Sequence, residues 1–254
     1  MIRRDDGAGW ILIMQYDHAV LSGRLMERWG NETFSSLDPP AETLFAVREH
    51  DCGWKEWDSS PKINPENGYP ANFMEMESSD QAGIWRRSFE SHSGAHPYAS
   101  SLIALHFARF NRKLLSKDPK DPYAKSLEGE IGRFVLKHLD IDISEQGGIP
   151  PGVKTSLRLL QVGDIISLAL CHGWDQVEIP DVPVDYEGST AKLSLKSGDG
   201  FNFTIKPYPF SGTLLDLSVG GLRLGRKSYA DDGDLRSALD LAPRVTLDFT
   251  IGKG

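Results

Sequence analysis

The sequence has little cysteine, no excess of positive charge and no long hydrophobic run, and each absence excludes a class of protein. Its two cysteines, Cys52 and Cys171, form neither a disulfide framework nor the paired spacing of a zinc ribbon, so a reduced, intracellular setting is the simpler interpretation. Lysine and arginine number 28 against 36 acidic residues, a net charge of −8. This balance argues against a protein that binds a nucleic-acid polymer through a basic face. The apolar run "IISLALC" is far too short to cross a membrane.

The remaining composition is that of an ordinary globular protein. Of the 254 residues, 39% are hydrophobic and 25% are charged. The stretch "MIRRDDGAGW" lacks the apolar core of a secretion signal. We therefore expect a cytoplasmic protein with no membrane partner, whose oligomeric state the composition does not indicate.

The hydrophobic pattern predicts an α+β protein with a mainly helical body over residues 1–176 and a small antiparallel sheet over residues 177–254. The body begins with a predicted β-hairpin around the turn sequence "DDGAG", and this hairpin could join the sheet. Apolar residues at helical spacing, with proline and glycine at the boundaries, predict helices over about 15–29, 40–51, 80–92, 97–115, 122–139 and 154–172. Residues 55–80 are predicted to form a long ordered loop, and "SEQGGIPPG" to link the last two helices.

Four of these predicted helices carry a histidine or an aspartate within the apolar face. They contribute His18, the adjacent pair His50 and Asp51, His106, and Asp164. Asp164 lies inside "LLQVGDIISLALC", where an unpaired buried carboxylate would cost several kcal/mol. A divalent metal shared by His18, His50, Asp51 and Asp164 would compensate that charge. Imidazole and carboxylate ligands together suit Mn, Fe, Co, Ni or Zn.

The order of these residues resembles the HD-domain superfamily of metal-dependent phosphohydrolases. In that helical superfamily a histidine is followed by a His-Asp pair at a helix end and by a later aspartate, which here are His18, His50-Asp51 and Asp164. The stretches "QYDHAVLSGRLMERWG" and "REHDCGWKEWD" also resemble a bacterial family with no assigned activity. The resemblance implies that these four residues bind a first metal, and that His106 binds a second metal or the substrate phosphate.

A metal site of this kind predicts hydrolysis of a small phosphorylated molecule by a water that the metal activates. We expect Asp51 to orient that water, and His106 to contact the substrate. Arg109 and Lys113 can share a helix face with His106 and could neutralise the phosphate, while Trp54 could form a pocket wall above the metal.

Three alternatives remain open from the sequence. A di-iron oxygenase would use His106 together with His92 or His96 as ligands. A non-catalytic binding module would keep a vestigial metal site and use its sheet as an interaction surface. A purely structural network would pair Asp164 with His50 or His18.

Overall fold

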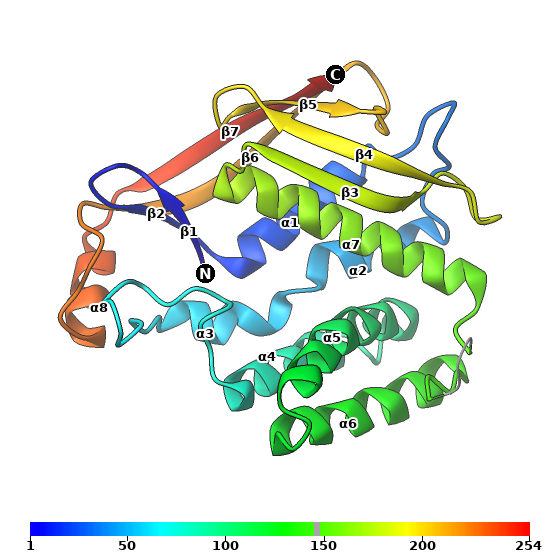
Figure 1. The fold of residues 1–254 in the computed structure, drawn as a ribbon, viewed down its shortest axis with the longest axis horizontal. Helices are drawn as coiled ribbons and strands as arrows, with labels where there is room; N and C mark the ends of the chain where they lie inside the picture. Colours follow the sequence, from blue (N-terminus) through cyan, green and yellow to red (C-terminus); the bar gives the residue numbers. More distant parts are fainter. Residues whose placement is uncertain (145–147) are drawn as a thin grey trace.

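Seven strands form one mixed sheet, and the helices pack below it (Figure 1). This computed structural model describes residues 1–144 and 148–254; the remaining three, within the predicted linker "SEQGGIPPG", lie outside the described residues. The strands run in the order β1-β2-β6-β7-β5-β4-β3. They are β1 (Ile2–Asp5), β2 (Trp10–Ile13), β3 (Gln176–Pro183), β4 (Thr190–Ser197), β5 (Asn202–Lys206), β6 (Leu214–Leu224) and β7 (Arg244–Lys253).

The sheet corrects the predicted fold class, because it is neither small nor purely antiparallel. Strands β5 and β7 pair in parallel, with Asn202 opposite Thr250. The N-terminal hairpin is an integral part of the sheet, since β2 pairs with β6 and places Trp10 opposite Leu224. Alternating hydrophobicity predicts that a segment is a strand, but the identity and direction of its partner depend on where the rest of the chain lies.

The helices of the body follow the predicted segments, and their boundaries have local causes. Four begin at a proline in the first turn, where the missing N–H leaves no hydrogen bond unmade. Asp121 also caps one of them by accepting from the backbone N–H groups of Tyr123 and Ala124. The helices are α1 (Gln15–Met26), α2 (Pro40–Glu49), α3 (Lys55–Ser59), α4 (Ser78–Glu90), α5 (Pro97–Lys117), α6 (Pro122–Leu139), α7 (Pro151–His172) and α8 (Asp232–Asp240).

Two of these helices lie where the sequence pattern predicted none. Helix α3 occupies the start of the segment predicted as a loop, and α8 lies between β6 and β7 in the region predicted as sheet. Both are short, and only Leu235 of α8 is fully buried on that helix. Short helices carry little periodic signal, which is why they were missed.

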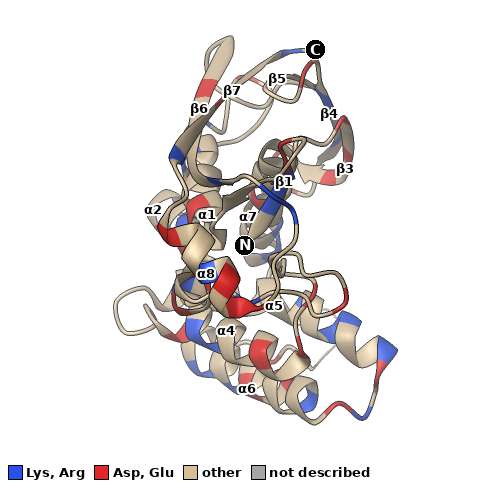
Figure 2. Cartoon of the chain, turned by 90° about the vertical axis from the view of Figure 1, so that its left-hand side faces the viewer, with Lys and Arg blue, Asp and Glu red and all other residues tan. Residues whose placement is uncertain are grey.

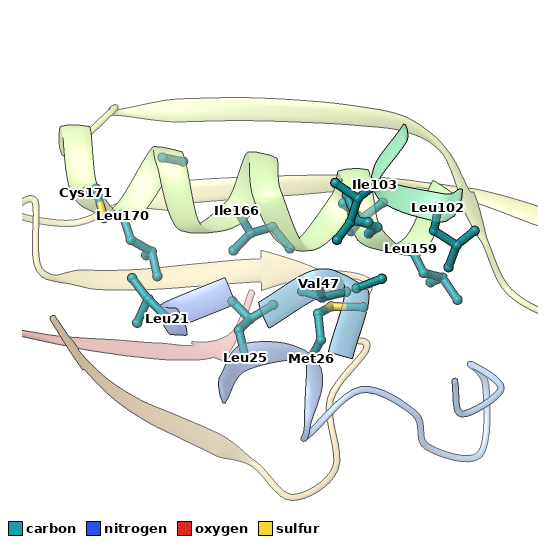
Figure 3. Close-up of a cluster of buried hydrophobic side chains, with 14 of the residues drawn as sticks. Leu21, Leu25, Met26, Val47, Leu102, Ile103, Leu159, Ile166, Leu170 and Cys171 are labelled. Carbon is teal, nitrogen blue, oxygen red and sulfur yellow. The ribbon is translucent and has the colours of Figure 1, made fainter. Parts of the chain in front are cut away.

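The core joins the sheet to two successive layers of helices (Figure 1). Helices α1 and α7 contact the sheet through β6, β3 and β1, and α5 and α2 pack on their other side. Figure 3 shows side chains from these four helices meeting, among them Leu21, Val47, Ile103 and Ile166. A polar side chain on the inner face of one of these four helices is therefore buried in the interior of the protein.

Charged residues of both signs are distributed along the helices (Figure 2). Arg86 pairs with Glu130 and Arg112 with Glu128, which ties the outer helices together. Within the described part of the chain, no helix combines the length and apolarity that a membrane crossing requires.

Candidate metal centre

Four of the predicted site residues meet between α1, α2, α5 and α7. His18 lies on α1, the pair His50 and Asp51 follows the last residue of α2, and Asp164 lies on α7. Their exposed fractions are 1%, 1%, 5% and 6% in that order. The helices therefore bury two imidazoles and two carboxylates together, as the sequence predicted.

The turn after Asp51 brings a glycine against helix α4. The residues Cys52–Trp54 form a single 3₁₀ turn, and a Cβ atom on Gly53 would lie 2.2 Å from the carbonyl oxygen of Ile84. The Gly53 N–H donates to the hydroxyl of Ser88 at 3.1 Å. This close approach holds the His50-Asp51 pair in position from behind.

The hydrogen bonds around His18 determine its tautomer. The Ser167 hydroxyl donates to the carbonyl oxygen of Asp164 at 2.9 Å, so its oxygen accepts from His18 Nδ1 at 2.9 Å. His18 Nε2 then faces Asp51 Oδ2 at 3.0 Å. Two lone pairs cannot approach so closely, so a proton or a metal ion must lie between these atoms.

His50, like His18, has its Nδ1 bonded to a protein acceptor and its Nε2 facing the buried carboxylates. Its Nδ1 donates to the carbonyl oxygen of Val47 at 2.7 Å, which leaves Nε2 directed at the two carboxylates, 3.7 Å from Asp51 Oδ2 and 3.6 Å from Asp164 Oδ1. Among the described residues, Nε2 has no hydrogen-bond partner although it is fully buried. An orphaned buried nitrogen of this kind indicates a position that a ligand atom should fill.

The electrostatics of the cluster favour a cation at its centre. Burial lowers the pKa of His50, but the charges of Asp51 and Asp164 outweigh burial and raise that pKa to about 9. Burial raises the pKa of Asp164, but His50 and the other two histidines hold it below its ordinary value. Asp164 therefore remains charged in the interior, and His50 keeps a proton when no metal competes for that position.

The donor types of these residues suit a metal ion, and their separations are close to, though mostly slightly wider than, those of a bound ligand set. Ligand atoms about 2.0–2.2 Å from a metal lie roughly 3–3.5 Å from one another. Here Asp164 Oδ1 lies 3.8 Å from His18 Nε2, and the other separations between imidazole and carboxylate run from 3.0 to 3.7 Å. The metal-ligating atoms of His18, His50 and Asp51 all lie within 4.8 Å of one another. Buried histidine and aspartate groups of this chain can thus hold a metal ion.

His106 lies beside this centre, and the centroid of its ring is 5.4 Å from that of His50. Its Nε2 is 3.7 Å from Asp164 Oδ2, while His18 and His50 face Oδ1. Burial lowers the pKa of His106 to about 4, so the ring is neutral near neutral pH. His106 therefore presents an uncharged imidazole at the edge of the cluster.

The two histidines of the di-iron alternative lie elsewhere. His96 Nδ1 pairs with Glu42 Oε1 at 2.7 Å and its ring stacks on Phe45. His92 lies 3.6 Å from Glu49, in a separate group with Cys52 on the outer side of the same turn. Burial raises the pKa of Cys52 to about 11, so its thiol is protonated at neutral pH. The ligand atoms of His50, His106 and Asp164 lie within 4.8 Å of one another, so a second metal beside His106 would share His50 and Asp164 with the first centre.

A cavity of about 280 Å³ opens onto the cluster. His18, His50, Asp51, His106 and Asp164 line one end of it. Its walls include Trp54 and Lys113, which the sequence singled out for the substrate. Arg109, predicted beside them, is exposed and does not line this cavity.

Sequence reasoning missed three residues of the site, although each has a spacing that could have revealed it. Ser167 follows Asp164 by three positions on α7, and Gln15 precedes His18 by three on α1, where its amide donates to Asp51 Oδ2 at 3.3 Å. Lys117 follows Lys113 by four on α5 and also lines the cavity. Residues three or four apart share a helix face.

Comparison with known protein families matches residues 1–225 to the model of a protein of unknown function (DUF3891). The chain belongs to the DUF3891 family. The DUF3891 match includes every residue of the metal centre and extends through β6. Searches of curated proteins and of solved structures give no match.

Proposed function

We propose that this DUF3891 protein is a metal-dependent phosphohydrolase that acts on a small phosphorylated molecule. His18, His50, Asp51 and Asp164 would hold one divalent transition metal, of the group Mn, Fe, Co, Ni and Zn. The order of these residues resembles the HD-domain superfamily, which supports the same chemistry.

One observation carries the proposal. Both histidines commit Nδ1 to a protein acceptor, and both direct Nε2 at the same two buried carboxylates. Hydrogen bonding of the outer ring nitrogen is the usual way in which a protein orients a metal-binding imidazole. His50 Nε2 is buried 3.6 Å from Asp164 and 3.7 Å from Asp51, beyond ordinary hydrogen-bond distance, and this spacing supports a shared metal ion over direct hydrogen bonds.

The chain supplies three further groups for such a reaction. A bound metal would lower the pKa of a coordinated water and polarise a phosphoryl oxygen. Gln15 holds Asp51 by one carboxylate oxygen, so the other oxygen of Asp51 can orient the attacking water. The neutral ring of His106, on the cavity wall, can accept a proton or contact the phosphate. Lys113 adds positive charge to the same cavity.

The cavity also supports a small substrate. Its volume of about 280 Å³ lies at the lower end of the range for small-molecule sites. A polymer would need an open groove and, for a nucleic acid, a basic surface. The net charge of −8 does not favour such a surface.

The test is elemental analysis of the protein purified without chelator, followed by a hydrolysis assay with p-nitrophenyl phosphate. We expect near-stoichiometric metal in the parent and its loss, together with the loss of activity, in Asp51→Asn. The matched control is Glu49→Gln, which neutralises a buried carboxylate two positions away that faces His92 instead of the cluster. Absence of metal from the parent, even after reconstitution with Mn, Fe, Co, Ni and Zn, would refute the proposal.

A further inference from the structure

The cavity runs along one face of helix α5, from the metal centre to the end of the helix. His106, Phe110, Lys113 and Lys117 are spaced four, three and four residues apart, so they form a single stripe. All four line the cavity. With a rise of about 1.5 Å per residue, Lys113 and Lys117 lie roughly 10 and 16 Å beyond His106 along the helix axis.

The middle of this stripe is apolar and mainly aromatic. The rings of Trp85 and Phe107 stack with centroids 5.5 Å apart, and Phe110 lies 6.2 Å from Trp85. Leu168 of α7 and Leu114 complete this part of the lining. The middle of the cavity therefore suits an apolar or planar body and offers little to a charged group.

Several buried polar atoms of the described lining residues lack a hydrogen-bond partner, and two of them belong to Trp54 and Gln81. Trp54 is 2% exposed and Gln81 is 8% exposed. In the described part of the chain, neither the indole N–H of Trp54 nor the side-chain oxygen of Gln81 has a hydrogen-bond partner. Both residues line the cavity, so a molecule bound there can satisfy them.

The two lysines lie at the end away from the metal, and no acidic side chain among the described lining residues lies at that end. The carboxylates that line the cavity are Asp51 and Asp164, both at the metal end. Across residues 1–144 and 148–254, neither Lys113 nor Lys117 forms a salt bridge, whereas Arg112 of the same helix pairs with Glu128. The two lysines therefore make this end of the cavity positive, so it attracts an anion although the chain as a whole has a net charge of −8.

From this arrangement we infer that the substrate is a bipolar amphiphile. It carries its phosphoester at one end, an apolar body in the middle, and a second anionic group that pairs with Lys113 and Lys117 at the other end. The phosphoester end rests on the proposed function; the apolar body and the second anion rest on the cavity itself.

Two phosphonates, which resist hydrolysis, test the second anion directly. Octylphosphonate supplies the phosphate-like end and the apolar body, and 8-phosphonooctanoate adds a carboxylate at the far end. Their dissociation constants for the metal-loaded protein would be measured by isothermal titration calorimetry. If no cation paired with it, the added carboxylate would weaken binding, because it would be desolvated against an apolar wall. We expect the opposite, a gain on the order of 5- to 10-fold, because the carboxylate forms ion pairs with two exposed lysines.

The lysines are tested with a double variant and a matched control. Lys113→Gln with Lys117→Gln should abolish or reverse the gain of 8-phosphonooctanoate over octylphosphonate. Lys125→Gln with Lys137→Gln removes the same charge from α6, outside the cavity lining, and should preserve the gain. The inference is overturned if the carboxylate gives no gain, if the gain survives in the Lys113/Lys117 variant, or if neither long phosphonate binds.

The proposed function fails in a different way. Methylphosphonate, which lacks the apolar body, reports the metal end alone. If methylphosphonate and octylphosphonate each bind the parent and the Asp51→Asn variant with the same affinity, the phosphoester does not reach the metal centre. The gain that depends on the lysines is the ratio of the dissociation constants of octylphosphonate and 8-phosphonooctanoate, so it can still be measured in that case.

Discussion

Ser167 determines which nitrogen of His18 carries a proton. Its hydroxyl donates to the Asp164 carbonyl oxygen, and its oxygen therefore accepts from His18 Nδ1 at 2.9 Å. His18 Nε2 is left to face Asp51 Oδ2. A serine one turn beyond an aspartate thus connects α7 to α1 and orients a candidate metal ligand.

Replacing Ser167 by alanine should weaken metal binding without removing a ligand. His18 Nδ1 loses its acceptor, and the ring is free to rotate or to change tautomer, so we expect a 10- to 100-fold rise in the metal dissociation constant. Competition with a chromophoric chelator would measure it. Ser100→Ala is the matched control, since it deletes a buried hydroxyl of α5 that lacks a hydrogen-bond partner among the described residues. Equal affinities in the two variants would contradict the role assigned to Ser167.

His106→Gln should separate metal binding from turnover. His106 is not one of the four proposed ligands and approaches Asp164 at Oδ2, 3.7 Å away, so metal content should remain near that of the parent. Turnover should fall on the order of 100-fold or more if His106 transfers a proton or contacts the phosphate. Metal per chain and kcat, measured beside His18→Gln, would decide the role. Loss of metal from His106→Gln would make His106 a ligand instead.

The metal-free protein should lose stability as the pH rises from neutral to alkaline. The folded pKa of His50 is about 9, above an unfolded value of about 6.5. Its contribution to stability is therefore complete below pH 6.5 and is lost as the pH approaches 9, by on the order of 1–3 kcal/mol. Thermal melts with EDTA across this range would show the fall, and His50→Gln should flatten it. Zn²⁺ should raise the melting temperature more at pH 8.5 than at pH 6.5, because metal and proton compete for His50. The same pH dependence in His50→Gln and the parent would exclude His50 as its source.

Gly53→Ala should destabilise the turn behind the His50-Asp51 pair. The new Cβ would lie 2.2 Å from the Ile84 carbonyl oxygen, so α4 must move away. We expect a loss of about 1–3 kcal/mol in the free energy of unfolding, together with weaker metal binding. Gly132→Ala on α6 meets nothing within 4 Å and should instead stabilise the helix by about 0.5–1 kcal/mol. Denaturant melts of both variants make the comparison, and an unaffected Gly53→Ala would show that α4 accommodates the methyl group.

The sequence by itself determined the longer helices of the body and the histidines and aspartate that their apolar faces bury. His18, His106 and Asp164 each occupy an apolar face of a single helix, and that face follows from a period of 3.6 residues along the local chain. Helix starts were equally local, since a proline in the first turn, or Asp121 as a cap, acts over a few residues. Such properties need no knowledge of distant segments.

Only the tertiary structure decided how the sheet is assembled and how the site is completed. The parallel pairing of β5 with β7 and the addition of the hairpin to β6 depend on where distant strands are brought, which alternation does not encode. The tautomer of His18 depends on a serine 149 residues away. The cavity between the metal centre and Lys117 exists because helices pack at angles that leave space, and periodicity along one helix carries no information on that packing.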